Sequence, residues 1–236
     1  MTADARSAVW HPSPNFNSRQ GHPITMIVLH YTGMPDGAEA RARLCDPDAQ
    51  VSAHYFIEED GSLYQLVREA DRAWHAGVAC WQGEPEVNGM SVGIELQNPG
   101  HEHGYRPFPA QQIDSLIALI QDIRSRHAVP VRRIVGHADV APVRKTDPGE
   151  LFPWTRLARA GCAWMPGPEP GATPIQDLVS TLAQIGYQTG NEKGDPETRA
   201  ALFAFQRRFL PENLTGEADA STLARLADVV KNLNES

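Results

Sequence analysis

The strongest constraint on the fold is the run at residues 24–32, which is nearly all apolar and rich in β-branched side chains. Such a run is typical of a strand buried on both faces of a sheet, because a half-exposed strand would alternate apolar and polar residues. His30 lies near the end of the run, and Gly33 follows it. We therefore expect a central strand that carries an imidazole at its carboxyl end.

Other segments predict a sheet around this strand. Residues 52–57 and 62–67 flank an Asp60-Gly61 pair, which is a strong hairpin signal. Residues 91–96 and 131–135 are two more short apolar segments that we interpret as strands.

Helices should cover this sheet. Apolar residues recur at steps of three and four between residues 109 and 126, which predicts an amphipathic helix that packs on the sheet. A weaker helical pattern covers residues 37–45. We predict an α/β fold with a mixed central β-sheet flanked by helices, followed by a small C-terminal three-helix domain.

A proline-rich segment divides the chain. Residues 165–174 read Met-Pro-Gly-Pro-Glu-Pro-Gly-Ala-Thr-Pro, a composition typical of a stiff, extended connector. We predict a catalytic domain at residues 1–164, a linker at 165–173 and a second domain at 174–236. The second domain should hold helices at about residues 174–185, 196–209 and 220–232.

Two segments of the C-terminal part echo each other. Asp195 and Asp219 are each followed by Thr three residues later and by Leu seven residues later. We expect each Asp to cap a helix at its N-terminus, with Thr at the third helical position able to answer it and Leu turned inward.

Charge and composition exclude several partners. The formal net charge is −8, with 15 basic against 19 acidic residues up to residue 166 and 6 against 10 after it. Because no basic block stands out, we expect neither nucleic acid nor an anionic membrane as a partner.

The cysteines and the N-terminal segment bear on the compartment. Cys45, Cys80 and Cys162 are odd in number and widely spaced, so we expect free thiols rather than disulfides or a thiolate metal site. Residues 1–19 are polar, and no run is long enough to span a bilayer. We therefore expect no membrane insertion and a cytoplasmic location, or a periplasmic one if a signal peptide has been removed.

A second histidine and an aspartate lie on a loop that contains two prolines. His137 follows the strand predicted at 131–135, and Asp147 comes ten residues later. Together with His30 they form the two-nitrogen, one-oxygen set that catalytic zinc uses while a fourth position stays open for water. On spacing alone, the alternatives are core histidines with satisfied hydrogen bonds and an aspartate that starts a turn.

Two further ionisable residues lie near this set. Lys145 precedes Asp147 by two residues, so both side chains share a face if the segment is extended. Glu95 lies in the otherwise apolar strand at 91–96, where a buried carboxylate is costly unless it is paired, ligates a metal or acts in catalysis. The alternative is an exposed or salt-bridged Glu95 on a sheet edge.

Five ordered motifs recur across about residues 10–160. They comprise Leu29-His30-Tyr31-Thr32, Val51-Ser52-Ala53-His54-Tyr55-Phe56-Ile57, Ala73-Trp74-His75-Ala76-Gly77, Asn88 with Ser91-Val92-Gly93-Ile94-Glu95-Leu96, and the segment from Gly136 to Gly149. Together they resemble the zinc-dependent N-acetylmuramoyl-L-alanine amidases of the type-2 amidase family. This family includes AmpD- and AmiD-type enzymes, and it shares its fold with peptidoglycan recognition proteins.

The resemblance implies an activity and roles for the site residues. The family cuts the amide between the lactyl group of N-acetylmuramic acid and L-alanine. By resemblance one zinc ion per chain is bound by His30, His137 and Asp147, while Glu95 is the general base and Lys145 stabilises the oxyanion. The expected partners are peptidoglycan or anhydro-muropeptides.

Four residues are candidates for substrate binding, and one for a supporting role. We expect substrate contacts from Tyr31, Trp74, His75 and Asn88, with Trp74 offering an apolar face to sugar or peptide. For His75 a merely structural place is equally open. We interpret His54 as a structural or second-shell histidine. The remaining histidines, which we take as surface residues, are His11, His22, His101, His103 and His127.

The C-terminal part has its own resemblance. Motifs between residues 172 and 234 resemble the three-helix peptidoglycan-binding domain often attached to such enzymes. Lys193-Gly194-Asp195 replaces the usual Asp-Gly opening of that domain, so its ligand-binding loop is altered. We expect Phe205 and Phe209 in its core, and Gln206 either in the core or in contact with ligand.

Two choices stay open. The complete set of ligands and catalytic residues favours an enzyme over a peptidoglycan receptor that binds without cleaving. A cytosolic enzyme would trim anhydro-muropeptides in wall recycling, whereas an exported one would cut intact wall.

Overall fold

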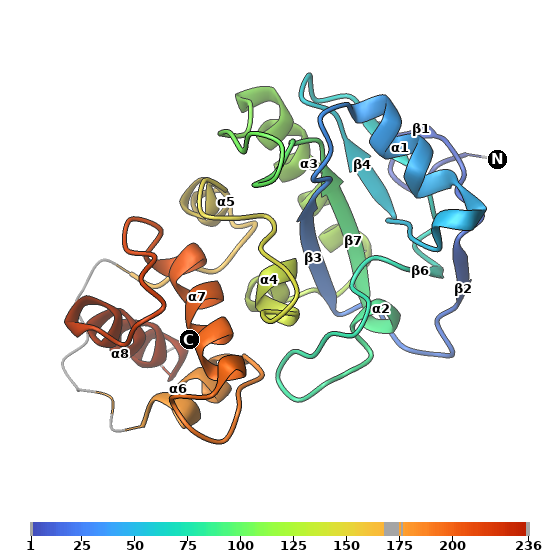
Figure 1. The fold of residues 1–236 in the computed structure, drawn as a ribbon. Helices are drawn as coiled ribbons and strands as arrows, with labels where there is room; N and C mark the ends of the chain where they lie inside the picture. Colours follow the sequence, from blue (N-terminus) through green and yellow to red (C-terminus); the bar gives the residue numbers. More distant parts are fainter. Residues whose placement is uncertain (1, 168–174, 176, 235–236) are drawn as a thin grey trace.

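A mixed sheet forms the centre of the molecule (Figure 1). The computed structural model describes residues 2–167, 175 and 177–234. Within this part, six strands pair in the order β1-β5-β4-β7-β3-β8. They are β1 Val9–Trp10, β3 Met26–Tyr31, β4 Tyr55–Ile57, β5 Leu63–Gln65, β7 Ser91–Leu96 and β8 Ile134–Gly136. A separate two-stranded sheet pairs β2 Phe16–Ser18 with β6 Asp71–Ala73.

The pairing confirms the mixed sheet that the sequence predicts. β3 pairs in parallel with both β7 and β8, and β4 pairs in parallel with β7. β4 and β5 form the predicted antiparallel hairpin around Asp60-Gly61. β3 and β7 therefore have neighbours on both sides, as expected for strands that read as buried.

The strand predicted at residues 131–135 is only half right. A 3-10 turn occupies Val131–Arg133, and the strand begins at Ile134. Pro130 precedes the turn, and its carbonyl accepts the N–H of Arg133 at 2.9 Å. The fixed φ of proline favours such a turn, which shortens the strand.

One face of the sheet packs on helix α3, Ala110–Arg126. Alternate residues of β3 and β7 point to it and join its apolar side chains in one buried cluster, among them Ile27, Leu29, Val92, Ile94, Leu116 and Ile120. This is the amphipathic helix that the spacing predicts. Each such side chain contributes about 1.5–3 kcal/mol when fully buried.

The opposite face carries the polar residues of the same strands. Here β3 presents Met26, Val28 and His30, while β7 presents Ser91, Gly93 and Glu95. Three helices lie on this face of the sheet, opposite α3. They are α1 Gly37–Cys45, α2 Val87–Met90 and α4 His137–Val140. The polar site residues and the core under α3 thus occupy opposite faces of one sheet.

The C-terminal helices gather at one side of the molecule, beyond α4 and α5 (Trp154–Arg159) (Figure 1). They are α6 Leu178–Ile185, α7 Pro196–Phe209 and α8 Ala220–Asn234. Their apolar side chains share one buried cluster with residues of the sheet and its loops, including Val28, Val135, Leu182, Phe205 and Leu226. The predicted α/β class with three C-terminal helices is confirmed, and these helices are packed against the rest of the chain.

The capping prediction holds for one helix and fails for the other. Asp219 accepts the N–H of Thr222 at 2.9 Å, as a cap should. Asp195 makes no cap, because its carboxylate accepts the N–H groups of Asn191 and Glu192 in the loop before the helix. Leu202 and Leu226 are buried as predicted, and Thr198 and Thr222 are buried as well.

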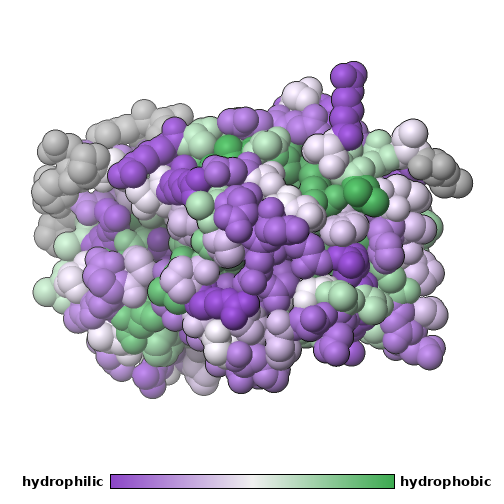
Figure 2. All heavy atoms as spheres, turned by 90° about the horizontal axis from the view of Figure 1, so that it is seen from above, coloured by the Kyte–Doolittle hydropathy of each residue, from purple (hydrophilic) through white to green (hydrophobic). Residues whose placement is uncertain are grey.

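Core and surface follow the expected division. Phe205 and Phe209 are buried, and so is Gln206, whose amide bonds Thr215, Thr222 and Gly216 within the helical part. The three cysteines are free, as predicted. The face seen in Figure 2 is mainly hydrophilic, with hydrophobic residues in scattered groups.

Two predictions concern linker and membrane. The linker predicted at 165–173 falls largely on residues 168–174, which lie outside the described part, so the domain boundary stays a prediction. Among the described residues, no helix combines the length and the apolar character that crossing a bilayer requires.

Candidate metal centre and catalytic site

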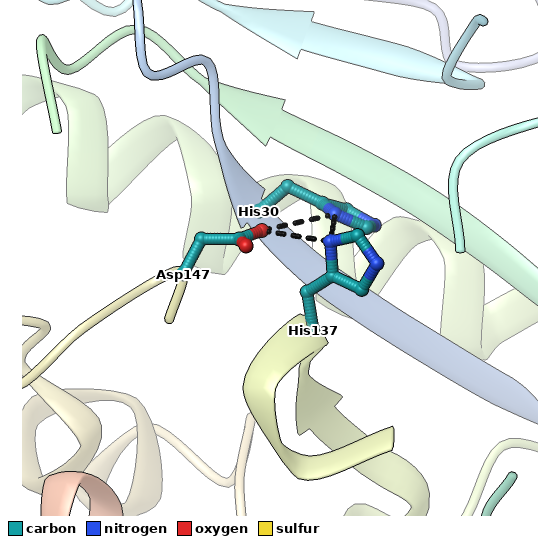
Figure 3. Close-up of side chains that lie close together, drawn as sticks. All are labelled: His30, His137 and Asp147. Carbon is teal, nitrogen blue, oxygen red and sulfur yellow. Dashed lines mark hydrogen bonds and ion pairs between the residues drawn. The ribbon is translucent and has the colours of Figure 1, made fainter. Parts of the chain in front are cut away.

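Three predicted ligands meet at one point (Figure 3). His30 comes from the end of β3, His137 is the first residue of α4, and Asp147 lies on the loop that follows. The two Nδ1 atoms are 2.9 Å apart, and the Asp147 Oδ2 atom lies 3.2 Å from that of His30 and 3.0 Å from that of His137. All three residues are buried.

The backbone explains why these residues converge. β3 and β8 are adjacent and parallel, so their carboxyl ends lie at the same edge of the sheet. The Ala138 N–H donates to the Asp147 carbonyl at 2.8 Å, which ties the loop back to α4. A Cβ at Gly136 would lie 2.6 Å from Cδ of Pro148, so only glycine permits this close approach.

Hydrogen bonds fix the tautomer of His137. Its Nε2 atom lies 3.1 Å from the carbonyl oxygen of Ala76, which can only accept a hydrogen bond. Nε2 therefore carries a proton, so in the neutral ring, which is the form that binds a metal, the lone pair is on Nδ1 and faces Asp147.

A relay of three side chains fixes the tautomer of His30. The Ser91 hydroxyl donates to the Val87 carbonyl at 2.5 Å, so its oxygen accepts the Nε2–H of His75 at 3.1 Å. Burial lowers the pKa of His75 well below the usual value, so that ring is neutral and its Nδ1 is an acceptor. It accepts the Nε2–H of His30 at 3.1 Å, which leaves a lone pair on Nδ1 of His30.

Three acceptors thus face one another with no proton among them. Burial and the neighbouring His137 lower the pKa of His30 to about 4. Two lone pairs and a carboxylate at this spacing repel each other unless a cation lies between them, and their number and type suit a metal with an open fourth position. The residues therefore fit a metal ion.

Glu95 lies beside this centre. It pairs with His30 in the parallel register of β7 and β3, so both side chains project from the same face. It is only 9 % exposed, and its Oε2 atom has no hydrogen-bond partner. Burial and the charge of Asp147 raise the pKa of Glu95 to about 8, although Lys145 opposes that rise. β7 is an interior strand, so Glu95 does not lie on a sheet edge.

A cavity of about 590 Å³ opens over the centre. Its walls bring together six of the predicted site residues, and they add side chains to which the sequence assigns no role at the site. The predicted members are Tyr31, His75, Glu95, His137, Lys145 and Asp147, and the additional ones include Arg43, His101, Arg144 and Thr146. His30 lies beneath this wall, in contact with His75 and His137.

Two predicted substrate residues lie elsewhere. Trp74 follows β6 and its indole N–H bonds the side chain of Asn17. Asn88 is buried, and its side-chain oxygen accepts the N–H groups of His75 and Ala76. Among the described residues neither side chain lines the cavity, and Asn88 instead fixes the loop that carries His75.

His75 and His54 form a buried layer under the centre. A Cβ at Gly93 would lie 2.3 Å from Cγ of His75, so glycine makes room for that ring on the strand. His54 accepts the Gly93 N–H at 2.9 Å on Nδ1, and its Nε2 atom lies 2.7 Å from Nη2 of Arg19 and 3.1 Å from the Asp71 carbonyl oxygen. These contacts agree with a supporting role for His54.

His101 is a surface residue that the sequence gives no reason to connect with the site. Its Nδ1 atom lies 2.8 Å from the Tyr31 hydroxyl, which also lies 2.9 Å from Oγ1 of Thr146. On its other side His101 pairs with Glu150 at 3.1 Å. A lone histidine on a loop gives no periodic signal, so only the fold reveals its place.

Comparison with known proteins identifies the family. Residues 20–150, more than half of the chain, match the model of the N-acetylmuramoyl-L-alanine amidases. The chain belongs to the N-acetylmuramoyl-L-alanine amidase family. Residues 172–226 match a second model, that of a peptidoglycan binding domain.

Individual relatives agree with this membership. The amidase AmiD of Escherichia coli strain K12 is 39 % identical over 225 residues, which cover 85 % of this chain and 80 % of AmiD. The 1,6-anhydro-N-acetylmuramyl-L-alanine amidase AmpD of Haemophilus influenzae is 36 % identical over 61 % of this chain and 86 % of its own length.

Solved structures of such amidases share the whole fold. The complex of Escherichia coli AmiD with anhydro-N-acetylmuramic acid-L-Ala-D-γ-Glu-L-Lys superimposes with a TM-score of 0.79 at 33 % identity, covering 94 % of this chain and 98 % of AmiD. AmpDh3 of Pseudomonas aeruginosa in complex with an anhydromuramic pentapeptide gives 0.79 at 28 % identity, with 95 % of each chain covered.

Ser91→Ala tests the relay beneath His30. Without the hydroxyl, His75 is no longer held as an acceptor for the Nε2–H of His30, so we expect the affinity for a divalent metal ion to fall about tenfold, as for other groups that orient metal ligands. Chelator competition measures the affinity. Ser115→Ala removes a hydroxyl that donates to the Gly61 carbonyl far from the site and serves as the matched control. Equal affinities of both variants would contradict the relay.

Glu95→Gln tests the burial of the carboxyl group in the metal-free protein. The folded-state pKa of Glu95 is about 8, against 4.5 for an ordinary Glu, so between these values only the unfolded state loses its proton. The wild type therefore loses stability as pH rises, whereas Gln has no proton to lose. We subtract the free energy of unfolding of the wild type from that of Glu95→Gln. We expect this difference to rise by about 3 kcal/mol between about pH 5 and about pH 8.

Urea unfolding at both pH values, with a chelator present throughout, measures this difference. A parallel pH dependence of the two proteins would mean that Glu95 is ionised in the folded protein.

Proposed function

We propose that this chain is a zinc-dependent amidase that hydrolyses the amide between N-acetylmuramic acid, or its 1,6-anhydro form, and L-alanine in peptidoglycan fragments. The observation that carries the proposal is the convergence of two imidazole lone pairs and a carboxylate beside Glu95, whose Oε2 atom has no hydrogen-bond partner. Relatives named for this activity support the substrate class. One of them, AmiD, is solved with an anhydromuramyl peptide, and so is the structurally similar AmpDh3.

Zinc is the proposed metal, one ion per chain, held by His30, His137 and Asp147. A set of two histidines and one carboxylate also serves ferrous iron in oxygenases, so the donor atoms alone do not choose between the two metals. Membership of an amidase family favours zinc, because hydrolysis needs a Lewis acid and no change of oxidation state. Elemental analysis of the purified protein distinguishes them.

The mechanism assigns one task to each polar group around the centre. When bound, zinc supplies Lewis acidity and lowers the pKa of a water to about 7. Glu95 accepts a proton from the attacking water as its oxygen bonds to the lactyl carbonyl carbon. Lys145, on the cavity wall, stabilises the negative charge that develops on the carbonyl oxygen. Glu95 then passes its proton to the nitrogen of L-alanine as the C–N bond breaks.

Burial prepares Glu95 for this double task. A carboxyl group with a pKa of about 8 binds a proton more readily than one in water does, which suits a base that must later act as an acid. The ammonium of Lys145 opposes that rise, so it also keeps part of the Glu95 population ionised.

For the domains we keep the division predicted from the sequence. Residues 1–164 form the amidase domain, 165–173 the linker and 174–236 a peptidoglycan-binding-like domain. The match of residues 172–226 to a peptidoglycan binding domain supports the third part.

Cell-wall recycling in the cytoplasm is the proposed setting. The support for this setting is that Cys45, Cys80 and Cys162 are all free thiols, which fits a reducing compartment. An exported amidase that cuts intact wall is the alternative, and the peptidoglycan-binding-like domain favours it.

Replacing the two proposed catalytic residues should separate chemistry from metal binding. We expect Glu95→Gln to lower kcat by roughly a hundred- to ten-thousand-fold through loss of the base, and Lys145→Met by about a hundred- to a thousand-fold. Both variants should retain zinc, since neither removes a ligand. Release of peptide from a soluble anhydro-muropeptide measures activity, and elemental analysis measures zinc. Lys193→Met, at an exposed position of the helical part, is the control.

Near-normal turnover of Glu95→Gln would exclude Glu95 as the base. Loss of zinc in that variant would instead make it part of the metal site.

The substrate form decides between the two settings. For a recycling enzyme we expect kcat/KM to be higher on a soluble anhydro-muropeptide than on purified sacculi, because a free fragment enters the cavity without being extracted from a cross-linked mesh. Parallel assays of peptide release from the two substrates measure this ratio. Faster release from sacculi would favour the exported amidase.

A further inference from the structure

A buried carboxylate next to the metal centre is bonded mainly by the C-terminal helices. Asp139 follows the proposed ligand His137 by two residues and is 2 % exposed. Its Oδ2 atom accepts the Gly136 N–H at 2.7 Å and Nη1 of Arg208 at 2.9 Å. Its Oδ1 atom accepts the hydroxyl of Tyr187 at 2.7 Å. Two of its three donors therefore belong to the part of the chain beyond residue 174.

Arg208 holds more than this carboxylate. From α7, its Nη2 atom lies 3.2 Å from the carbonyl oxygen of Ile134 in β8 and 3.2 Å from that of Trp164. Its guanidinium carbon lies 4.2 Å from the ring centroid of Trp154. Arg208 is itself only 4 % exposed. Its hydrogen bond to the Ile134 carbonyl holds β8, the strand that leads into His137.

Tyr187 completes the arrangement from the end of α6. It is buried against Trp81, with ring centroids 5.3 Å apart and planes at 82°. Burial and the charge of Asp139 raise the pKa of Tyr187 well above its usual value, so the hydroxyl keeps its proton and donates. The carbonyl of Gly186, the residue before Tyr187, accepts the N–H of Gln82 at 2.9 Å. This hydrogen bond ties the end of α6 to the amidase part.

The geometry determines what these contacts control. Asp139 closes the turn from Gly136 through its bond to the Gly136 N–H, and His137 lies inside that turn. A buried carboxylate that lost its cationic partner would rearrange, because an unpaired buried charge is costly. The turn would then lose the side chain that closes it, and the imidazole of His137 would lose its fixed direction.

We propose that Arg208 and Tyr187 are positioning residues for the metal centre, which act through Asp139 on the turn that aims His137. The helical part then completes the catalytic centre in addition to any contact it makes with peptidoglycan. This inference rests on the proposed function, since it takes His137 to be a metal ligand.

Tyr187→Phe and Arg208→Lys in the full-length chain test the inference. Tyr187→Phe removes one hydroxyl. Arg208→Lys keeps the positive charge, but a single ammonium cannot replace the two guanidinium nitrogens that contact Asp139, Ile134 and Trp164. We expect each to weaken zinc binding about tenfold and to lower kcat with little change in KM. Zinc affinity is measured by competition with a chromophoric chelator, and kcat and KM on a soluble anhydro-muropeptide.

Arg199→Met is the matched control. Arg199 lies on the same helix, its side chain is 55 % exposed, and it pairs only with the exposed Glu217. Its zinc affinity should equal that of the wild type. If Arg208→Lys fails to fold, Tyr187→Phe alone decides the question, because it removes a single atom.

Two results have different meanings. If Tyr187→Phe lowers the melting temperature of the metal-free protein yet binds zinc and turns over like the wild type, Tyr187 serves domain packing alone and the inference is overturned. If the wild type itself binds no zinc, the proposed function fails instead.

Discussion

The convergence of three hydrogen-bond acceptors in a buried pocket is the constraint on which the rest of the structure depends. The two Nδ1 atoms of His30 and His137 and the Oδ2 atom of Asp147 lie 2.9–3.2 Å apart. Their like partial charges repel at this distance, so the fold must hold them in place. It does so from outside. The Ala76 carbonyl accepts the Nε2–H of His137. His75, held by Ser91, accepts the Nε2–H of His30. The rigidity of the centre is therefore supplied by groups outside the set of proposed ligands.

The sheet separates stabilisation from chemistry. In β7 the residues Val92, Ile94 and Leu96 pack toward α3, while Ser91, Gly93 and Glu95 face the site. The apolar face supplies the burial that keeps the strand in place, which lets the other face carry groups that are costly to bury. The two-sided strand also explains why Glu95 can be both central in the sheet and close to a cavity.

Much of this could be predicted from the sequence, because its signals are local. The apolar run around Leu29, the Asp60-Gly61 hairpin and the periodicity of α3 each reflect short-range rules, and the structure contains all three elements. Pairing His30 with His137 and Asp147 needed a family resemblance, since the ligands lie on distant segments. The places of His101 and Asn88 could not be predicted, because each depends on which loops meet in space. Asp195 misled for a related reason: its carboxylate had a nearer set of backbone donors in the preceding loop.

The parallel register of β3 and β7 has a consequence for how such a chain can change over time. His30 faces Glu95 across one pair of strands, and the segment between them holds a helix, a hairpin and several loops. Loops can lengthen at small entropic cost, so that intervening segment is free to acquire new surfaces and new specificities. A single residue inserted within either strand would instead turn its functional side chain to the α3 side. Variation in this fold should therefore accumulate as loop length, with the strand lengths held constant.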